Sequence, residues 1–227
     1  MSPEPTDTAL RSHRVTPGQR KQKRRPTARG TETRAQVIEA AVHCICEEGF
    51  GAASMNRIAK RAGVTWGVMQ YHFGDRGGLF SAVLDAGYQH LTERLKTIEI
   101  EGEGIRERVG GLVDAGWEIF RAPMARACFE IVLATRSEMT PRSASRDRLL
   151  AVARQLSRSC DKLLSQTLCD KQPPKKAQRV FVSALRGFAF EVMQYPSDYN
   201  YARERDALTD VLAAYLENLD TDGSRTA

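Results

Sequence analysis

The chain has 227 residues, enough for one large domain or for a small and a medium one, and its 41% apolar and 27% charged residues are ordinary for a globular protein. No apolar run approaches the roughly 20 residues of a membrane-spanning helix, and no hydrophobic signal segment is present. The five cysteines include no CxxC pair, which favours a reduced, intracellular protein over a disulfide framework. We therefore expect a cytoplasmic protein without membrane contact.

Residues 1–30 account for the whole net charge of +6, because eight Lys and Arg side chains stand there against Glu4 and Asp7. A basic segment with few apolar residues cannot bury enough surface to fold alone, so we predict a disordered N-terminal arm. Two roles are open. The arm could lie on DNA phosphates or in a minor groove, or it could be a solvated leader that only aids solubility.

The first helix is predicted to begin at Thr33 and to end at Gly49. Thr33 and Gln36 have the spacing of a capping box, in which each side chain bonds to the backbone of the other residue. Apolar residues follow at helical spacing, and Gly49 with Phe50 fits a glycine C-cap and its apolar neighbour.

Two short helices joined by a glycine turn are predicted next. Ser54 is suited to cap the first of them, and Thr65 the second, which runs to about His72. The turn between them, residues 62–64, has the sequence Ala-Gly-Val. This arrangement is typical of a helix-turn-helix. Residues 49–74 contain three basic residues and no acidic one, which favours DNA phosphates as the partner.

The second short helix is the predicted recognition helix, because the N-terminal residues of such a helix reach base edges in the major groove. Gln70 can form a bidentate pair with adenine, and Trp66 or Val68 can contact a thymine methyl group. Glycine at position 67 removes bulk where the backbone approaches DNA. The predicted reading set is Thr65, Trp66, Gly67, Val68 and Gln70.

Residues 33–84 resemble the N-terminal domain of the TetR family of transcriptional regulators. The matching residues, all at the family's spacing, are Gly49-Phe50, Ser54, Ile58-Ala59, Ala62-Gly63-Val64, Gly67 and His72-Phe73. The resemblance implies base contacts from the recognition helix. The phosphate contacts that it implies come from Thr33, Ser54, Tyr71, His72 and Arg76.

Three positions depart from the commonest family pattern. Trp66 and Arg76 stand where Lys is frequent, and Gln70 stands where Tyr is frequent. Arg76 keeps the charge, whereas Trp66 and Gln70 bear on which operator is read and not on whether DNA is bound. Arg57 adds a basic side chain to the predicted DNA surface. For Tyr71 and His72, the alternative to a phosphate contact is packing within the domain, a choice that the sequence leaves open.

The rest of the chain is predicted to be helical. Gly77 and Gly78 stand in the first turn of the next helix, after the N-cap Asp75, where they indicate either a soft hinge or an exposed turn that tolerates glycine. Helices are expected from Asp75 toward Ile100 and over about 105–121, 125–138, 143–169, 175–195 and 202–219.

The last two helices carry apolar stripes that favour a four-helix homodimer interface, with a monomeric bundle as the alternative. A dimer would place its recognition helices about 34 Å apart, one turn of DNA, on a palindromic operator. A small, largely apolar effector is expected among the middle helices. Its predicted lining is Trp117, Phe120, Phe129, Met139, Phe188 and Met193. Glu130 and Glu191 interrupt apolar runs and are expected either to meet the ligand or to face solvent.

The expected fold is all-α, with an N-terminal three-helix helix-turn-helix DNA-binding domain and a C-terminal helical ligand-binding and dimerisation bundle. The expected limits are 1–30 for the arm, 31–76 and 77–219 for the two domains, and 220–227 for a flexible tail.

No catalytic site, metal or cofactor is predicted. The strongest candidate is the run His43-Cys44-Ile45-Cys46, whose side chains two residues apart face different sides of a helix. The predicted function is therefore a ligand-responsive repressor associated with the nucleoid, where repression is inferred from family analogy alone. An enzyme and a helical interaction module are the alternatives.

Overall fold

The computed structural model describes residues 28–136, 144–168, 174–194 and 200–223, and within these ranges every regular element is a helix. The prediction of an all-α fold is thus confirmed. The helices are α1 Ala28–Glu48, α2 Met55–Arg61, α3 Trp66–Phe73, α4 Arg76–Lys96, α5 Ile105–Arg121, α6 Pro123–Thr135, α7 Ala144–Thr167, α8 Lys175–Gln194 and α9 Ala202–Gly223.

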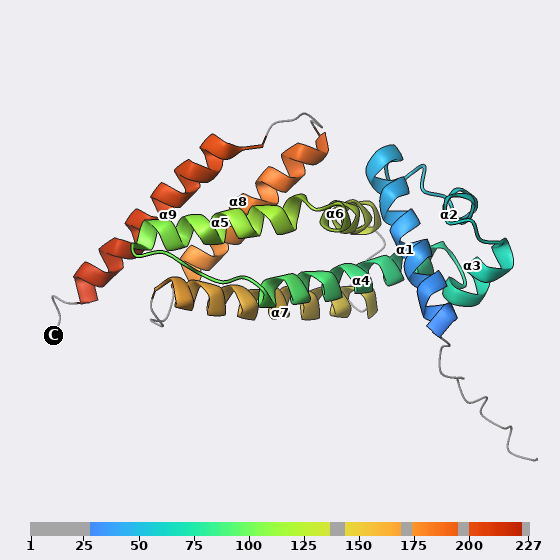
Figure 1. The fold of residues 1–227 in the computed structure, drawn as a ribbon, viewed down its shortest axis with the longest axis horizontal. Coiled ribbons are helices and arrows are strands. Elements are labelled where there is room, and N and C mark those ends of the chain that lie inside the picture. Colours follow the sequence, from blue (N-terminus) through green and yellow to red (C-terminus); the bar gives the residue numbers. More distant parts are fainter. Residues whose placement is uncertain (1–27, 137–143, 169–173, 195–199, 224–227) are drawn as a thin grey trace, which may run out of the picture.

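The helices form an elongated molecule with α1, α2 and α3 at one end (Figure 1). Helix α4 leads from this end into the body of the protein, where it lies beside α7. Helix α5 runs through the body and packs against α6, α7, α8 and α9. None of the described helices is long and apolar enough to cross a membrane.

Helix α1 begins at Ala28, five residues before the predicted start, so the capping box at Thr33 and Gln36 is wrong. Thr33 lies inside the helix, and its hydroxyl donates to the Arg29 carbonyl at 3.0 Å. Gln36 instead donates from Nε2 to the Ala62 carbonyl at 3.0 Å. Ala62 is the C-cap of α2, and the carbonyls at a helix end have no partner within the helix, so Gln36 fastens α1 to that end.

The other predicted caps are confirmed at three of four positions. Gly49 has a φ of +81°, the left-handed conformation that ends α1. Ser54 accepts from the Arg57 N–H at 3.3 Å, and Asp75 accepts from the Gly78 N–H at 2.7 Å. Thr65 has the extended backbone of an N-cap, but its side chain makes no capping hydrogen bond.

Two boundaries differ from prediction around the middle of the chain. Helix α4 ends at Lys96, and Ile98 and Ile100 still pack against the core although they lie beyond the helix. Helix α6 begins at Pro123, two residues before the predicted start at about 125, because proline is well suited to the first turn of a helix. Residues 28–30 of the predicted disordered arm and residues 220–223 of the predicted flexible tail are helical, and the rest of both segments lies outside the described residues.

The buried apolar residues form two clusters. One joins α1, α2, α3 and the start of α4, and it includes Ala127 and Ile131 of α6. The other joins α5, α7, α8 and α9. Helix α6 therefore belongs to the core of the N-terminal helices although it lies far from them in sequence. The core also continues past residue 76, the predicted limit of the first domain, as far as Val83 on α4.

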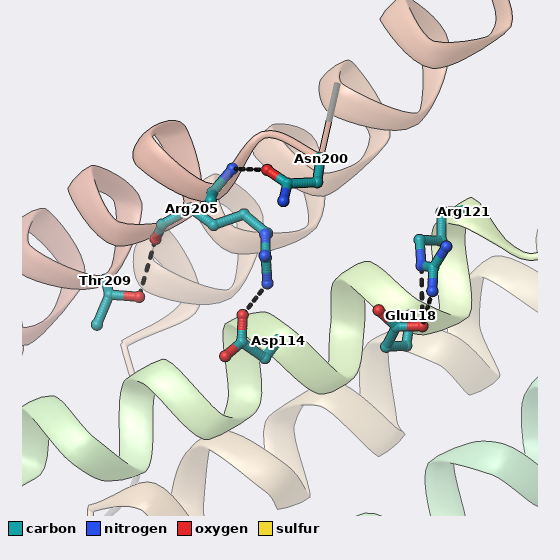
Figure 2. Close-up of polar contacts among 7 residues, drawn as sticks. Asp114, Glu118, Arg121, Asn200, Arg205 and Thr209 are labelled. Carbon is teal, nitrogen blue, oxygen red and sulfur yellow. Dashed lines mark hydrogen bonds and ion pairs between the residues drawn. The ribbon is translucent and has the colours of Figure 1, made fainter. Parts of the chain in front are cut away.

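Polar contacts hold α9 on α5 of the same chain. Arg205 of α9 forms an ion pair with Asp114 of α5, as Figure 2 shows, and its guanidinium carbon lies 5.6 Å from the centre of the Trp117 ring. Arg106 of α5 pairs with Asp206 and Asp210 of α9 at 2.7 and 2.6 Å. Exposed pairs of this kind contribute only modestly to stability, but they fix the side of α9 that faces α5.

Gly78 is required by close packing, so the alternative of an exposed turn that merely tolerates glycine does not hold at this position. A Cβ built on Gly78 would collide with the carbonyl oxygen of Phe73, the last residue of α3. The start of α4 thus packs closely against the end of α3, and the hinge at Gly77–Gly78 stays a prediction. At Gly77 the nearest atom is an oxygen of the Asp75 cap at 3.3 Å.

We expect Gly78→Ala to lower the free energy of unfolding by about 1–3 kcal/mol, because the backbone of Phe73 has to move away. The matched control is Gly111→Ala on α5, where nothing lies within 4 Å of the new Cβ. This control should stabilise the protein by up to about 1 kcal/mol through its higher helix propensity. Chemical denaturation at one protein concentration measures both, and equal effects of the two substitutions would refute the packing argument.

Candidate nucleic-acid interface

Helix α3 has one side fixed in the core and the other side open. Met69 and Phe73 are buried in the N-terminal core. Other side chains of the helix are open to solvent, because Trp66 is 51% exposed, Tyr71 is 84% exposed and Gln70 is exposed as well. A helix repeats every 3.6 residues, so positions 66 and 70 lie on one face. Large side chains therefore project from a helix that cannot rotate without emptying the core.

The turn before α3 sets how this helix crosses α2. Gly63 has a φ of +65°, and its N–H bonds to the Lys60 carbonyl at 3.2 Å. The Val64 N–H bonds to the Ala59 carbonyl at 3.0 Å. These two bonds close the end of α2 in the manner of a glycine C-cap, and only glycine adopts that conformation without strain. The predicted helix-turn-helix geometry is thus present.

Two of the three basic residues on α2 are paired with carboxylates of α1. The Nε of Arg57 lies 2.6 Å from Oε2 of Glu48. Arg61 binds Glu47 through two hydrogen bonds of 2.6 and 2.7 Å, and this hydrogen bonding lowers the pKa of Glu47. The side-chain amine of Lys60 is exposed, with no carboxylate partner among the described residues. Exposed ion pairs are weak, so Arg57 and Arg61 can exchange a carboxylate for a phosphate.

Arg76 makes local contacts that the sequence did not reveal. Its Nη2 donates to the Phe50 carbonyl at 2.7 Å. Its guanidinium carbon lies 4.6 Å from the centre of the Phe50 ring and 4.9 Å from that of Phe80. The charge of Arg76 thus stabilises the turn after α1, while its predicted phosphate contact stays a prediction.

The remaining residues that are predicted to contact phosphates differ in how far their side chains are exposed to solvent. Ser54 is exposed at the start of α2, and Tyr71 is almost fully exposed, so packing does not explain Tyr71. His72 is half-buried, with its ring edge-on to that of Tyr71 at 5.0 Å. Thr33 is half-buried within α1 and uses its hydroxyl locally. In the reading set, Thr65 and Gly67 are exposed and Val68 is half-buried.

The residues predicted to line an effector pocket mostly pack against other aromatic rings. The Trp117 and Phe188 ring centres lie 5.7 and 5.6 Å from that of Tyr201. Phe120 stacks on Phe129, with ring centres 6.0 Å apart. Met193 is half-buried, and Met139 lies outside the described residues.

A small apolar cavity lies between α4, α5, α7 and α8, with room for about one water molecule. Of the predicted lining residues that the structure describes, only Phe120 reaches it. The rest of its wall was not predicted, although the apolar spacing on α4 was a signal for it. The other lining residues are Leu91, Leu95, Ile98, Leu112, Gly116, Ile119, Cys160, Leu163, Phe181 and Leu185.

The two carboxylates that interrupt apolar runs have different environments. Glu191 is exposed, as one of its two expected placements requires. Glu130 is half-buried and contacts the backbone of another segment, while its predicted contact with a ligand stays a prediction. Its Oε2 accepts a hydrogen bond of 2.9 Å from the Phe50 N–H, a contact between α6 and the turn after α1.

The described cysteines Cys46, Cys128 and Cys160 lack the features of activated nucleophiles. Burial raises the pKa of the Cys128 thiol to about 12 and that of Cys160 to about 11. Burial also raises the pKa of Cys46, although the nearby Arg126 acts in the opposite direction. A reactive cysteine needs a lowered pKa instead. Among the described residues, no three His, Cys, Asp or Glu side chains are placed to hold a metal ion.

A profile of the family described as "Bacterial regulatory proteins, tetR family" matches residues 37–83. The chain is also 31% identical over 110 residues to the uncharacterized HTH-type transcriptional regulator TtgW of Pseudomonas putida, a match that covers 48% of this chain and 79% of that protein. The chain belongs to the tetR family. This family consists of transcriptional regulators and not of enzymes, as the sequence predicted.

Other relatives of the chain match over shorter stretches or by fold alone. The HTH-type transcriptional regulator BetI of Yersinia pestis (strain Pestoides F) is 41% identical over 63 residues, which cover 28% of this chain and only 32% of BetI. A TetR-family structure from Streptomyces coelicolor A3 has a TM-score of 0.57 at 21% identity, with 82% of this chain and 98% of that one covered. The multidrug binding protein EbrR, complexed with imidazole, has a TM-score of 0.54 at 21% identity, over 88% and 97%.

We expect Cys128 and Cys160 to resist alkylation by iodoacetamide at pH 8 while the protein is folded. The raised pKa values leave so little thiolate that labelling should be at least about 100-fold slower than for a free cysteine. Peptide mass spectrometry with and without denaturant measures the labelling. Rapid modification of either residue in the native protein would contradict the assigned burial.

Proposed function

We propose that this protein is a DNA-binding transcriptional regulator that reads a palindromic operator through α3 as a homodimer. The observation that carries this proposal is the outward face of α3, where Trp66, Gln70 and Tyr71 project from a helix anchored by Met69 and Phe73. Exposed aromatic side chains on a rigid short helix are unfavourable in water unless a partner covers them.

The residues divide into those that read bases and those that hold phosphates. Base contacts are assigned to Trp66, Val68 and Gln70, with Thr65 and Gly67 at the helix start where the backbone comes closest to the groove. Phosphate contacts are assigned to the side chains around this face. These are Thr33, Ser54, Arg57, Tyr71, His72 and Arg76.

A repressor in the cytoplasm, bound to the nucleoid, is the form of regulation that the family suggests. The structural relative NalD carries the description "secondary repressor" of an efflux pump, and this description applies to NalD itself. The site of a small apolar effector is assigned to the cavity because its wall is wholly apolar and part of it belongs to α4, the helix that continues from the DNA-binding end. Since the cavity has room for about one water molecule, the helices around it have to separate to admit an effector.

Dimerisation through α8 and α9 is supported by apolar side chains that the chain itself leaves uncovered. Val211 and Tyr215 are exposed one helical turn apart on α9, and Val180 and Phe190 are exposed on α8. Their helices bury their opposite sides against α5, so these residues form an outer face. A second copy can cover the same face in an isologous contact.

The first experiment selects duplexes from random DNA with the purified protein and then titrates the selected sequence. We expect tight, salt-sensitive binding, and Gln70→Ala should weaken it by about tenfold or more, because a bidentate base pair is lost. Gln89→Ala, at an exposed position on α4, is the matched control and should leave the affinity unchanged.

Arg57→Ala, at one of the assigned phosphate contacts, separates phosphate binding from base reading in the same assay. It should weaken binding to every sequence alike and reduce the salt slope by about one. Failure of the wild-type protein to enrich any sequence would refute the proposal and favour a helical interaction module instead.

We expect the wild-type protein to sediment as a dimer and Val211→Glu to sediment as a monomer, because a carboxylate would be buried in the interface without a partner. Leu133→Glu is the matched control, since Leu133 is also an exposed aliphatic residue but lies on α6. Sedimentation equilibrium of the three proteins measures the mass. A dimer that survives Val211→Glu would place the interface elsewhere.

A further inference from the structure

The peptide groups of Phe50 are held from both sides by charged residues of other helices. The Phe50 N–H donates to Oε2 of Glu130 on α6 at 2.9 Å. The Phe50 carbonyl accepts from Nη2 of Arg76 on α4 at 2.7 Å. The Phe50 ring lies against the ring of Phe80, with centres 4.7 Å apart. Phe50, in the turn between α1 and α2, is therefore bound to both α4 and α6.

The bond to Glu130 satisfies an N–H that the cap of α1 leaves without a partner in the helix. Gly49 ends α1 in the left-handed conformation, and its N–H bonds to the Ile45 carbonyl at 2.9 Å. This single bond is that of the αL cap, in which the N–H of the next residue does not bond back into the helix. Here the N–H of that residue, Phe50, bonds to a carboxylate 80 positions later in the chain. The end of α1 is thus completed by α6.

Further contacts join α6 to α1 around this bond. The Cys46 thiol donates to the carbonyl of Pro123, the first residue of α6, at 3.3 Å. Ala127 and Ile131 of α6 are buried in the core of the N-terminal helices. Because α6 also packs on α5, whose residues line the apolar cavity, it connects that cavity to the turn after α1.

We propose that Glu130 is the positioning residue that couples the effector-binding helices to the helix-turn-helix. This inference rests on the proposed function. When α6 stays in its place, the carboxylate fixes the turn that leads to the Ser54 cap of α2, and thereby the angle at which α3 meets DNA. A movement of α6 pulls the carboxylate away from Phe50 and frees the turn. Glu130 touches no DNA in this account and acts only through the Phe50 backbone.

Two substitutions at Glu130 separate the hydrogen bond from the charge. Glu130→Gln keeps an oxygen acceptor of the same length, whereas Glu130→Met keeps the packing but has no comparable acceptor. Glu191→Gln and Glu191→Met, at an exposed site on α8, are the matched controls. Glu130→Ala repeats the test with a smaller side chain if circular dichroism shows that the methionine variant is unfolded.

Amide hydrogen exchange and DNA titration provide the readouts. In Glu130→Met, the Phe50 amide should exchange about tenfold faster or more, and affinity for DNA selected by the wild-type protein should fall about tenfold. By linkage, DNA should slow exchange in α6 of the wild-type protein, and this effect should vanish in Glu130→Met. Glu130→Gln and both Glu191 variants should behave as the wild type does.

The inference is overturned if Glu130→Met binds the selected DNA as tightly as the wild type, or if DNA still slows exchange in α6 of that variant. It is also overturned if Glu130→Gln loses as much affinity as Glu130→Met, because charge and not the bond would then be responsible. Failure of the proposed function is seen separately, since it appears in the wild-type protein as an absence of selective DNA binding.

Discussion

The hydrophobic core that α6 shares with the N-terminal helices is the constraint on which the rest of the structure depends. A bundle of three helices with two members as short as α2 and α3 has little apolar surface of its own to bury. Ala127 and Ile131 complete that core from α6, and Leu79, Phe80 and Val83 complete it from α4. Helices α4 and α6 therefore hold the DNA-binding end in place, and both also belong to the body of the protein. A displacement of either helix would shift α3.

Rigidity and exposure are combined in α3 because its few buried residues are placed at the right spacing. Met69 and Phe73 fix the rotation of the helix, Gly63 adopts the left-handed conformation of the turn before it, and Gly78 allows the start of α4 to approach its end closely. The exposed residues of α3 can therefore vary with the DNA sequence that is read, because the core of the fold does not depend on them. This separation explains why unusual residues such as Trp66 and Gln70 can stand on a familiar framework.

Local signals allowed most of the DNA-binding end to be predicted from sequence. Gly49, Ser54 and Asp75 have the predicted capping roles because each acts within a few residues of itself. The capping pattern failed at Thr33 because α1 begins earlier, at Ala28. The Gln36 side chain donates to the carbonyl of Ala62, at the end of α2, instead of capping α1. Capping patterns show where a helix can start, whereas tertiary contacts decide whether it starts earlier.

Contacts between distant segments could not be predicted in this way. The bond between Glu130 and Phe50 joins positions whose spacing carries no periodic signal. The wall of the cavity was missed because aliphatic residues on α4, α5, α7 and α8 come together through packing, while the more conspicuous aromatic residues Trp117 and Phe188 pack against each other.

The most direct test of the account is a hydroxyl-radical footprint of the protein on DNA selected by it. Two copies that each insert α3 predict two protected tracts related by a twofold axis, with centres about one helical turn or a multiple of it apart on one face of the duplex. A single protected tract, or protection without such symmetry, would contradict the claim that a dimer reads the operator through α3.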